Sequence, residues 1–139
     1  MSTKKVLQAL QTGLIAARDG STIPTMPLKL LGLSAEISQD KYIEVIFITN
    51  NIPNEFWGAG ETYRGFLRLM LHWNIDGSGI YPPTEYMQSV CDYFIKGKRL
   101  YNDDIIVKVT DNPRITIVDE QPPEILVLAQ IEYYCFLKP

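Results

Sequence analysis

Two stretches of the chain place apolar residues at the three- and four-residue spacing of a helix. The first covers residues 3–18, with Thr3 at a capping position and Asp19-Gly20 at the end. Its apolar positions are Val6, Leu7, Leu10, Leu14 and Ala17. The second begins near Pro82-Pro83 and ends at Lys96-Gly97, with an apolar stripe of Tyr86, Met87, Val90, Cys91, Phe94 and Ile95. The pattern predicts two amphipathic helices that each cover something with one face.

Other stretches have the composition or the alternation of strands. Residues 42–49 are apolar at both parities, which predicts a central strand covered on both faces for much of its length. Residues 62–73 alternate, with Tyr63, Leu67, Leu69, Leu71 and Trp73 on one face and Arg64, Arg68 and His72 on the other. Further strands are predicted at 105–110, 114–118 and 125–137, and a short one at 28–33 after the proline-containing connector 21–27.

The predicted elements follow the order helix, strands, helix, strands, and neighbouring strands can pair through turns. We therefore predict an α+β fold, with a mostly antiparallel sheet and two helices packed on one face. The chain has 139 residues, of which 46% are hydrophobic and 21% charged, so residues 1–139 are expected to form a single domain around one core.

Charge and hydropathy exclude several classes of function. The formal net charge is −3, and no run of basic residues stands out, which argues against non-specific binding of phosphate backbones by the whole surface. Polar residues interrupt the apolar segment 6–17, so we expect neither a signal peptide nor a membrane span there. Cys91 and Cys135 fall on a helical stripe and in a strand, where thiols are typically reduced core residues.

The sequence offers little catalytic chemistry. His72 is the single histidine and lies within a predicted strand, so it is expected to be a half-buried polar residue on the sheet face. The two cysteines are too far apart in sequence for a typical zinc site. Gly77 and Gly79 precede a helix, but Pro82-Pro83 removes two backbone donors that a bound phosphate would use. We predict no catalytic residue, no metal and no cofactor.

The segment Asn50 to Glu61 has no periodicity and contains Phe56 and Trp57. Long loops that carry aromatic residues often bind a partner, and folding back onto the core is the alternative. Both readings remain open from the sequence alone.

Charged residues supply the remaining interface candidates. Arg64 and Arg68 share one face of a strand at a separation of about 13 Å, which suits a row of ion pairs between subunits better than a phosphate clamp. Isolated surface arginines are the alternative interpretation. The adjacent carboxylates Asp103-Asp104 and Asp119-Glu120 point to opposite faces of an extended chain and are expected to be solvated strand ends.

The order and length of the elements, with a few residues among them, resemble the tail terminator (tail completion) proteins of long-tailed bacteriophages. The resemblance runs roughly from Val6 to Tyr134 and includes the segments Tyr42-Ile-Glu-Val45, Gly58, Arg64-Gly65 and Gly77-Ser-Gly79 and a helix that ends near Phe94. It implies a small α+β subunit that forms a ring, usually of six, at the head-proximal end of the tail in the virion, after assembly in the host cytoplasm. Such a ring ends growth of the tail tube and presents a surface to the head-tail connector or stopper protein.

The resemblance implies no catalysis, no membrane and no specific binding of the DNA that passes through the lumen. Six touching spheres of the size expected for this chain, each about 37 Å across, enclose a hole of about the same width, which admits a DNA duplex. A ring formed head to tail needs two different matching patches on each subunit. We expect Arg64 and Arg68 to face acidic strand ends such as Asp103, Asp104, Asp119 or Glu120, and we expect Phe56 and Trp57 to dock on a neighbouring subunit or on the tube.

Two other functions stay open. One is a head-to-tail joining or stopper protein of the neck, which is also a non-enzymatic ring component. The other is a small α+β ligand-binding or enzyme domain whose site lies among Tyr and Asp residues. Oligomer size separates these three alternatives.

Overall fold

Helices and strands occupy most of the chain that the computed structural model describes, namely residues 3–24, 26–29, 41–52, 62–74, 81–121 and 124–137. In chain order the elements are α1 (Thr3–Asp19), β1 (Leu28–Lys29), β2 (Lys41–Ile52), β3 (Thr62–Asn74), α2 (Tyr81–Cys91), the 3-10 turn η1 (Asp92–Phe94), β4 (Arg99–Asn102), β5 (Ile105–Val109), β6 (Arg114–Gln121) and β7 (Glu124–Leu137).

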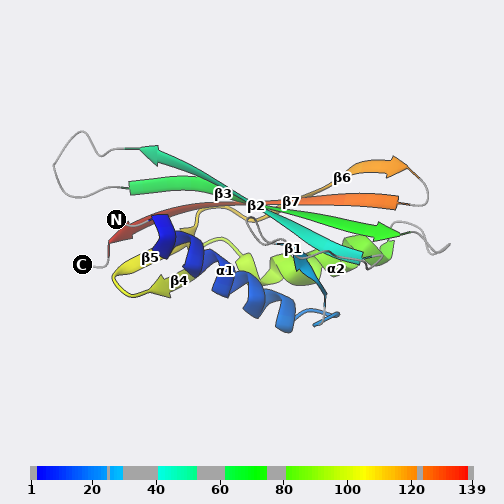
Figure 1. Ribbon diagram of the computed structural model, residues 1–139, viewed down its shortest axis with the longest axis horizontal. Helices are drawn as coiled ribbons and strands as arrows, with labels where there is room; N and C mark the ends of the chain where they lie inside the picture. The colour runs from blue at the N-terminus through cyan, green and yellow to red at the C-terminus, as the bar shows by residue number, and fades with distance from the viewer. Residues whose placement is uncertain are drawn as a thin grey trace.

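The described strands form one twisted sheet centred on β7 (Figure 1). Its strand order is β1-β2-β3-β7-β5-β4, and β6 also pairs with β7. One edge of β7 pairs antiparallel with β3 along almost its whole length, and the other edge is shared by β6 and β5. The C-terminal end of β2 and the N-terminal end of β3 lie at the left of Figure 1. The β6–β7 hairpin lies at the right, beside the C-terminal end of β3.

β5 and β6 follow each other along β7 and do not pair with each other. Ile105 to Val109 lie opposite the C-terminal part of β7, and Arg114 to Gln121 lie opposite its N-terminal part. Between them, the Thr110 amide donates to the Glu132 carbonyl oxygen at 3.0 Å. Neighbouring strands can pair through turns, but these two do not, because the 14-residue β7 offers enough backbone to pair with both.

Both helices lie on one face of the sheet, below it in Figure 1. α1 contacts β4 and β5, and α2 contacts β7, β6 and β3. The fully buried side chains include Leu10, Leu14, Met87, Val90, Phe94, Ile43, Leu67, Leu69, Leu71, Val127, Ala129, Ile131 and Tyr133. The predicted α+β fold, with a mostly antiparallel sheet and two helices on one face, is confirmed.

The two cysteines are buried members of this core, as the sequence predicted. Burial raises the pKa of the Cys91 thiol to about 12. Because thiol chemistry requires the thiolate, burial disfavours reaction at Cys91.

Three expectations about the elements are corrected by the structure. Within the described part of the chain, Ile43 and Val45 on one face of β2 are buried, whereas Ile46 and Ile48 on the other face are only half-buried. Ile95 is not part of the buried stripe of the second helix and is 56% exposed. The 3-10 turn after Cys91 has three residues per turn, and the chain becomes extended at Ile95, which takes its side chain out of the helical stripe. The sequence analysis also missed β4.

Gly65 allows β2 and the core to approach β3 closely. An added Cβ at this position would lie 2.7 Å from the Tyr133 hydroxyl oxygen and closer still to the Ile48 carbonyl oxygen. Both atoms belong to parts that cannot move easily, since one is backbone and the other is a fully buried ring. A side chain at residue 65 would therefore force β2 away from β3.

We predict that Gly65→Ala lowers the free energy of unfolding by about 2 kcal/mol or more, because overpacking displaces backbone. Gly20→Ala is the matched control, since its Cβ would meet the nearest atom, the Ala16 carbonyl oxygen, at an ordinary 3.6 Å. The control should be neutral or slightly stabilising. Urea denaturation measures both, and equal midpoints for Gly65→Ala and the wild type would contradict this account.

Candidate functional site

The face of the sheet opposite the helices is the main candidate for a functional surface. Residues of β2, β3, β6 and β7 that alternate with the core residues point to it, and no described helix covers it. Its half-buried apolar side chains are Ile46, Ile48, Phe66, Met70, Leu126, Leu128, Tyr134 and Phe136. We call this surface the open face. A contiguous, partly apolar face of this kind is typical of a protein contact surface.

His72 lies on the open face, on the strand and in the half-buried setting that the sequence predicted. Its ring stacks on Tyr42 at 4.4 Å between centroids, with an interplanar angle of 9°. Its Nε2 lies 3.2 Å from a carboxylate oxygen of Glu44. Because two neighbours fix the ring, it gives this end of the open face a rigid polar border.

A shallow hollow of about 260 Å³ lies near the middle of the open face. Its lining residues are Phe66, Asp111, Asn112, Arg114, Gln130 and Glu132. The lining mixes one aromatic ring with amides and charges of both signs. This composition suits recognition of a polar protein segment better than a purely apolar ligand.

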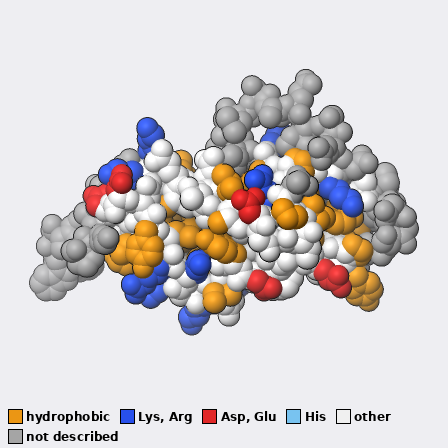
Figure 2. Space-filling model, turned by 90° about the horizontal axis from the view of Figure 1, so that it is seen from below, with side chains coloured by type: hydrophobic (Ala, Val, Ile, Leu, Met, Phe, Trp, Pro, Cys, Tyr) orange, Lys and Arg blue, Asp and Glu red, His pale blue; other side chains and the backbone are white. Residues whose placement is uncertain are grey.

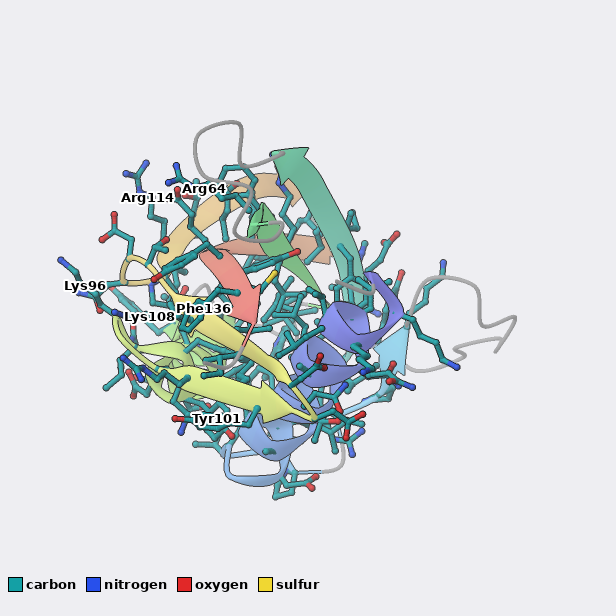
Figure 3. The ribbon with its side chains drawn as sticks, turned by 90° about the vertical axis from the view of Figure 1, so that its left-hand side faces the viewer. Arg64, Lys96, Tyr101, Lys108, Arg114 and Phe136 are labelled. Atoms are coloured by element: carbon teal, nitrogen blue, oxygen red, sulfur yellow. The ribbon has the colours of Figure 1, made fainter. Side chains whose placement is uncertain are left out.

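Basic side chains gather beside this hollow. Strand register places Arg99, Lys108, Tyr134 and Arg64 in one row across β4, β5, β7 and β3. Arg114 begins β6, opposite Gln130. Figure 3 shows Arg64, Lys96, Lys108 and Arg114 on the same side of the molecule, with Phe136 beside Lys108. We call Arg64, Lys96, Arg99, Lys108 and Arg114 the basic patch.

The loop between η1 and β4 carries Lys96 to this patch. The Lys96 amide donates to the side-chain oxygen of Asn112 at 3.0 Å, and the Gly97 amide donates to the Val109 carbonyl oxygen at 2.8 Å. Gly97 has a φ of 91°, a left-handed conformation that favours glycine. Residues from three separate segments are thereby fixed in one surface.

No ion pair involves a basic-patch residue within the described ranges of the chain. By contrast, the helix side of the molecule shows basic, acidic and hydrophobic side chains intermixed (Figure 2). The positive charge of the patch is therefore uncompensated by described neighbours, apart from the nearby carboxylates of Asp111 and Glu132.

Comparison with known proteins identifies the fold without a function. No protein-family model matches the sequence, and none of the curated proteins matches it. One solved structure is similar over 100% of this chain and 99% of its own chain, with a TM-score of 0.82 and 15% sequence identity. The name of that protein states no function. At this identity the similarity shows that the two chains share a fold.

The structure places the two predicted arginines on the open face. Arg64 is exposed, and Arg68 is half-buried and donates from Nε to the side-chain oxygen of Gln130 at 3.3 Å. Phe56 and Trp57 lie outside the described residues, as do Gly77 and Gly79.

Asp103 and Asp104 form the two-residue turn between β4 and β5, away from the predicted arginines. The Lys5 ammonium group contacts both carboxylates, at 3.8 Å from Asp103 and 3.1 Å from Asp104. A hydrogen bond from Lys5 holds the pKa of the Asp104 carboxyl below its usual range. Within the subunit these acids hold the start of α1 beside the turn.

Lys96, Arg99, Lys108 and Arg114 were not predicted from the sequence as members of the surface. Arg99 and Lys108 lie four residues from either side of the Asp103-Asp104 turn and are cross-strand partners. A hairpin assignment that included residues 99–102 as a strand would have placed the two basic residues together. Lys96 has no comparable signal, because its position depends on the side chain of a residue 16 positions away.

The described residues contain no group of three His, Cys, Asp or Glu side chains placed to hold a metal ion. Neither described helix has the length and apolar character needed to cross a membrane.

We predict that Lys5→Met raises the pKa of the Asp104 carboxyl toward its ordinary value of 3.8, because the hydrogen bond that favours the carboxylate is lost. Because the pKa of Asp104 is lower in the folded protein, the contact stabilises the fold at pH values above the ordinary pKa of the carboxyl. This stabilisation is lost as the pH falls through the lowered pKa of the folded state. NMR titration of the side-chain carboxyl carbon measures the change. Lys4→Met, at an exposed neighbouring position, is the control, and an unchanged Asp104 titration in Lys5→Met would refute the contact.

Proposed function

We propose that this chain is a structural subunit that closes into a ring with copies of itself and caps the tail tube of a long-tailed bacteriophage. In this function the ring ends tube elongation and provides the surface for head attachment. The element order that resembles tail terminator proteins supports the proposal, and the open face is the observation that carries it.

The open face supports assembly because its apolar side chains remain half-exposed in the single subunit. Met70 and Leu128 are cross-strand partners in the register of β3 and β7, and Phe66 lies on the same face of β3. Burial of apolar area against a second subunit contributes roughly 25 cal/mol for each Å² removed from water. A subunit that exposes such a face gains stability on association.

The chemistry of the described residues also favours a structural role. His72 is fixed between Tyr42 and Glu44, and both cysteines are buried. The described surface offers the partly apolar open face and the charged side chains of the basic patch. These are the features through which subunits recognise one another.

We predict a ring of six subunits, with a mass six times 15.8 kDa, or about 95 kDa, at high protein concentration or in the presence of tail tubes. Light scattering measures the mass, and electron microscopy of purified protein mixed with tail tubes tests capping. A particle of twelve subunits on the portal would favour the joining protein instead. A persistent monomer that is stabilised by a small molecule would favour a ligand-binding domain.

We predict that Thr116→Arg weakens ring formation at least about tenfold, because Thr116 is exposed on the open face, opposite Leu128. Thr12→Arg is the matched control at an exposed position of α1. Both variants should keep the circular dichroism spectrum and melting temperature of the wild type. Ring formation by Thr116→Arg at wild-type concentration would exclude the open face from the contact.

A further inference from the structure

The basic patch contains like charges placed directly opposite each other. Arg99 and Lys108 are cross-strand partners in the β4–β5 hairpin, and Arg64 lies two strands beyond Lys108 in the same row. Directly opposed like charges destabilise a sheet. The isolated subunit therefore carries an electrostatic cost at this site that an anionic partner would remove. We call the four residues of this register position the basic row: Arg99, Lys108, Tyr134 and Arg64.

Most acidic side chains in the described part of the chain are already paired or belong to the patch. The paired ones each lie within 3.8 Å of a nitrogen of a basic residue: Asp19, Glu44, Asp103 and Asp104. Asp111 and Glu132 line the hollow beside the patch. Glu85 and Asp92 remain, and no ion pair joins either of them to a basic side chain that the structure describes.

Glu85 and Asp92 lie together on the exposed side of α2 and the first residue of η1. At 3.6 residues per turn they share one stripe with Tyr81 and Gln88. All four residues are exposed, Tyr81 by 74%. The Gln88 amide nitrogen donates to a carboxylate oxygen of Asp92 at 2.7 Å, which fixes the end of the stripe. We call these residues the acidic stripe.

The acidic stripe and the basic row point away from each other in one subunit. The side of α2 opposite the stripe packs toward the sheet and carries its buried side chains, Pro83, Tyr86, Met87, Val90 and Cys91. Arg99 and Lys108 alternate with the core residues Leu100 and Val107, so the row points to the open face. The sheet and the helix layer below it separate the two charged surfaces (Figure 1).

The stripe and the row match in length. The stripe from Tyr81 to Asp92 is about 17 Å long at about 1.5 Å per residue. The row from Arg99 to Arg64 spans about 14 Å, because neighbouring strands lie about 4.8 Å apart. The two carboxylates of the stripe are seven residues apart, or about 10 Å. Lys108 and Arg64 are two strands apart, which is also about 10 Å.

We infer that the acidic stripe of one subunit binds the basic row of the next copy of this chain. In this contact Glu85 meets Lys108, and Asp92 meets Arg64. The inference rests on the proposed ring and names its contact. Two different surfaces on opposite layers of the subunit meet, so the contact is head to tail. Contacts of this type close into rings when the rotation between copies allows.

Tyr81 supplies the aromatic part of the contact. It lies one helical turn before Glu85, as Arg99 lies one strand before Lys108 in the row. The Tyr81 ring therefore meets the Arg99 guanidinium, and a cation over an aromatic ring is attracted by it. An exposed aromatic side chain of this kind is typical of the residues that anchor protein contacts.

A nucleic acid is the other polyanion that a basic surface with aromatic rings can bind. Two observations favour the acidic stripe. Asp111 and Glu132 line the hollow beside the row, where a continuous phosphate backbone would meet them. The whole chain carries a net charge of −3, which repels a long polyanion but not one short helix face.

A charge-exchange experiment tests the contact. The first variant carries Arg64→Glu with Lys108→Glu, and the second carries Glu85→Lys with Asp92→Lys. Each variant alone should associate at least about tenfold more weakly than the wild type, because each brings like charges together at every contact. An equimolar mixture should regain assembly, because each variant then supplies the charge that the other one lacks. Alternation of the two variants closes only even-numbered rings, so a restored hexamer would contain three of each.

Sedimentation velocity at low and high salt measures association, and circular dichroism checks that each variant folds. Lys4→Glu with Lys29→Glu is the control for the first variant, and Asp19→Lys is the control for the second. These controls change charge at exposed positions outside the contact and should assemble as the wild type does. Wild-type association should weaken as salt rises.

Tyr81→Ala tests the same contact without a change of charge. It should weaken association about threefold or more, because the ring over Arg99 is lost. Since Tyr81 is 74% exposed, the circular dichroism spectrum should stay that of the wild type. Unchanged association of Tyr81→Ala would contradict the contact.

The outcomes separate this inference from the proposed function. Rings that cap tubes, combined with charge variants that assemble normally or with a mixture no better than its parts, would overturn the inference alone. Restored assembly without any capping of tubes would overturn the proposed function alone. A wild-type monomer at every concentration and salt would overturn both. Salt-dependent binding of a short DNA duplex in place of restored assembly, lost in Arg64→Glu with Lys108→Glu, would reassign the patch to nucleic acid.

Discussion

The pairing of β7 with strands on both of its edges holds this protein together. β3 binds one edge along almost the whole strand, and β5 and β6 divide the other. Six alternate side chains of β7 are fully or nearly fully buried beneath the helices: Ile125, Val127, Ala129, Ile131, Tyr133 and Cys135. The even-numbered residues from Leu126 to Phe136 point to the open face. One strand thus carries the core on one side and the candidate contact surface on the other.

In the proposed ring, this arrangement couples assembly to the fold. Residues of the open face alternate with core residues on the same strands, so their spacing is fixed by backbone hydrogen bonds and by packing beneath. A partner meets a surface that is already ordered, which lowers the entropic cost of association. The like charges of Arg99 and Lys108 and the half-buried apolar side chains are tolerated in the subunit because the core supplies most of its stability.

The sequence predicted the elements correctly where one face is buried and the other is exposed to solvent. Strand 62–73 and the first helix followed this rule, and their faces are as expected. The rule failed for β2, because Ile46 and Ile48 are apolar without being covered by a described helix. Periodicity cannot distinguish an apolar residue of the core from one on a contact surface, since both satisfy the same pattern.

The candidate surface was predictable only in part. Arg64 and Arg68 were correctly assigned to one face of the sheet, because residues four positions apart on a strand point to the same side. Lys96 and Arg114 reach the surface through long-range pairing and through the Asn112 side chain, which no local pattern encodes. The contact of Lys5 with Asp103 and Asp104, about one hundred positions away in sequence, was not predicted, because no local pattern encodes it.

The central position of β7 also bears on how the chain is made. It is the last described strand to leave the ribosome, and until it emerges β1 to β3 and β4 to β5 are two separate groups with no shared partner. Nascent chains must keep these apolar segments apart while synthesis continues. Docking of the final strand then joins the two groups into one sheet, so the open face is complete only after this strand has paired.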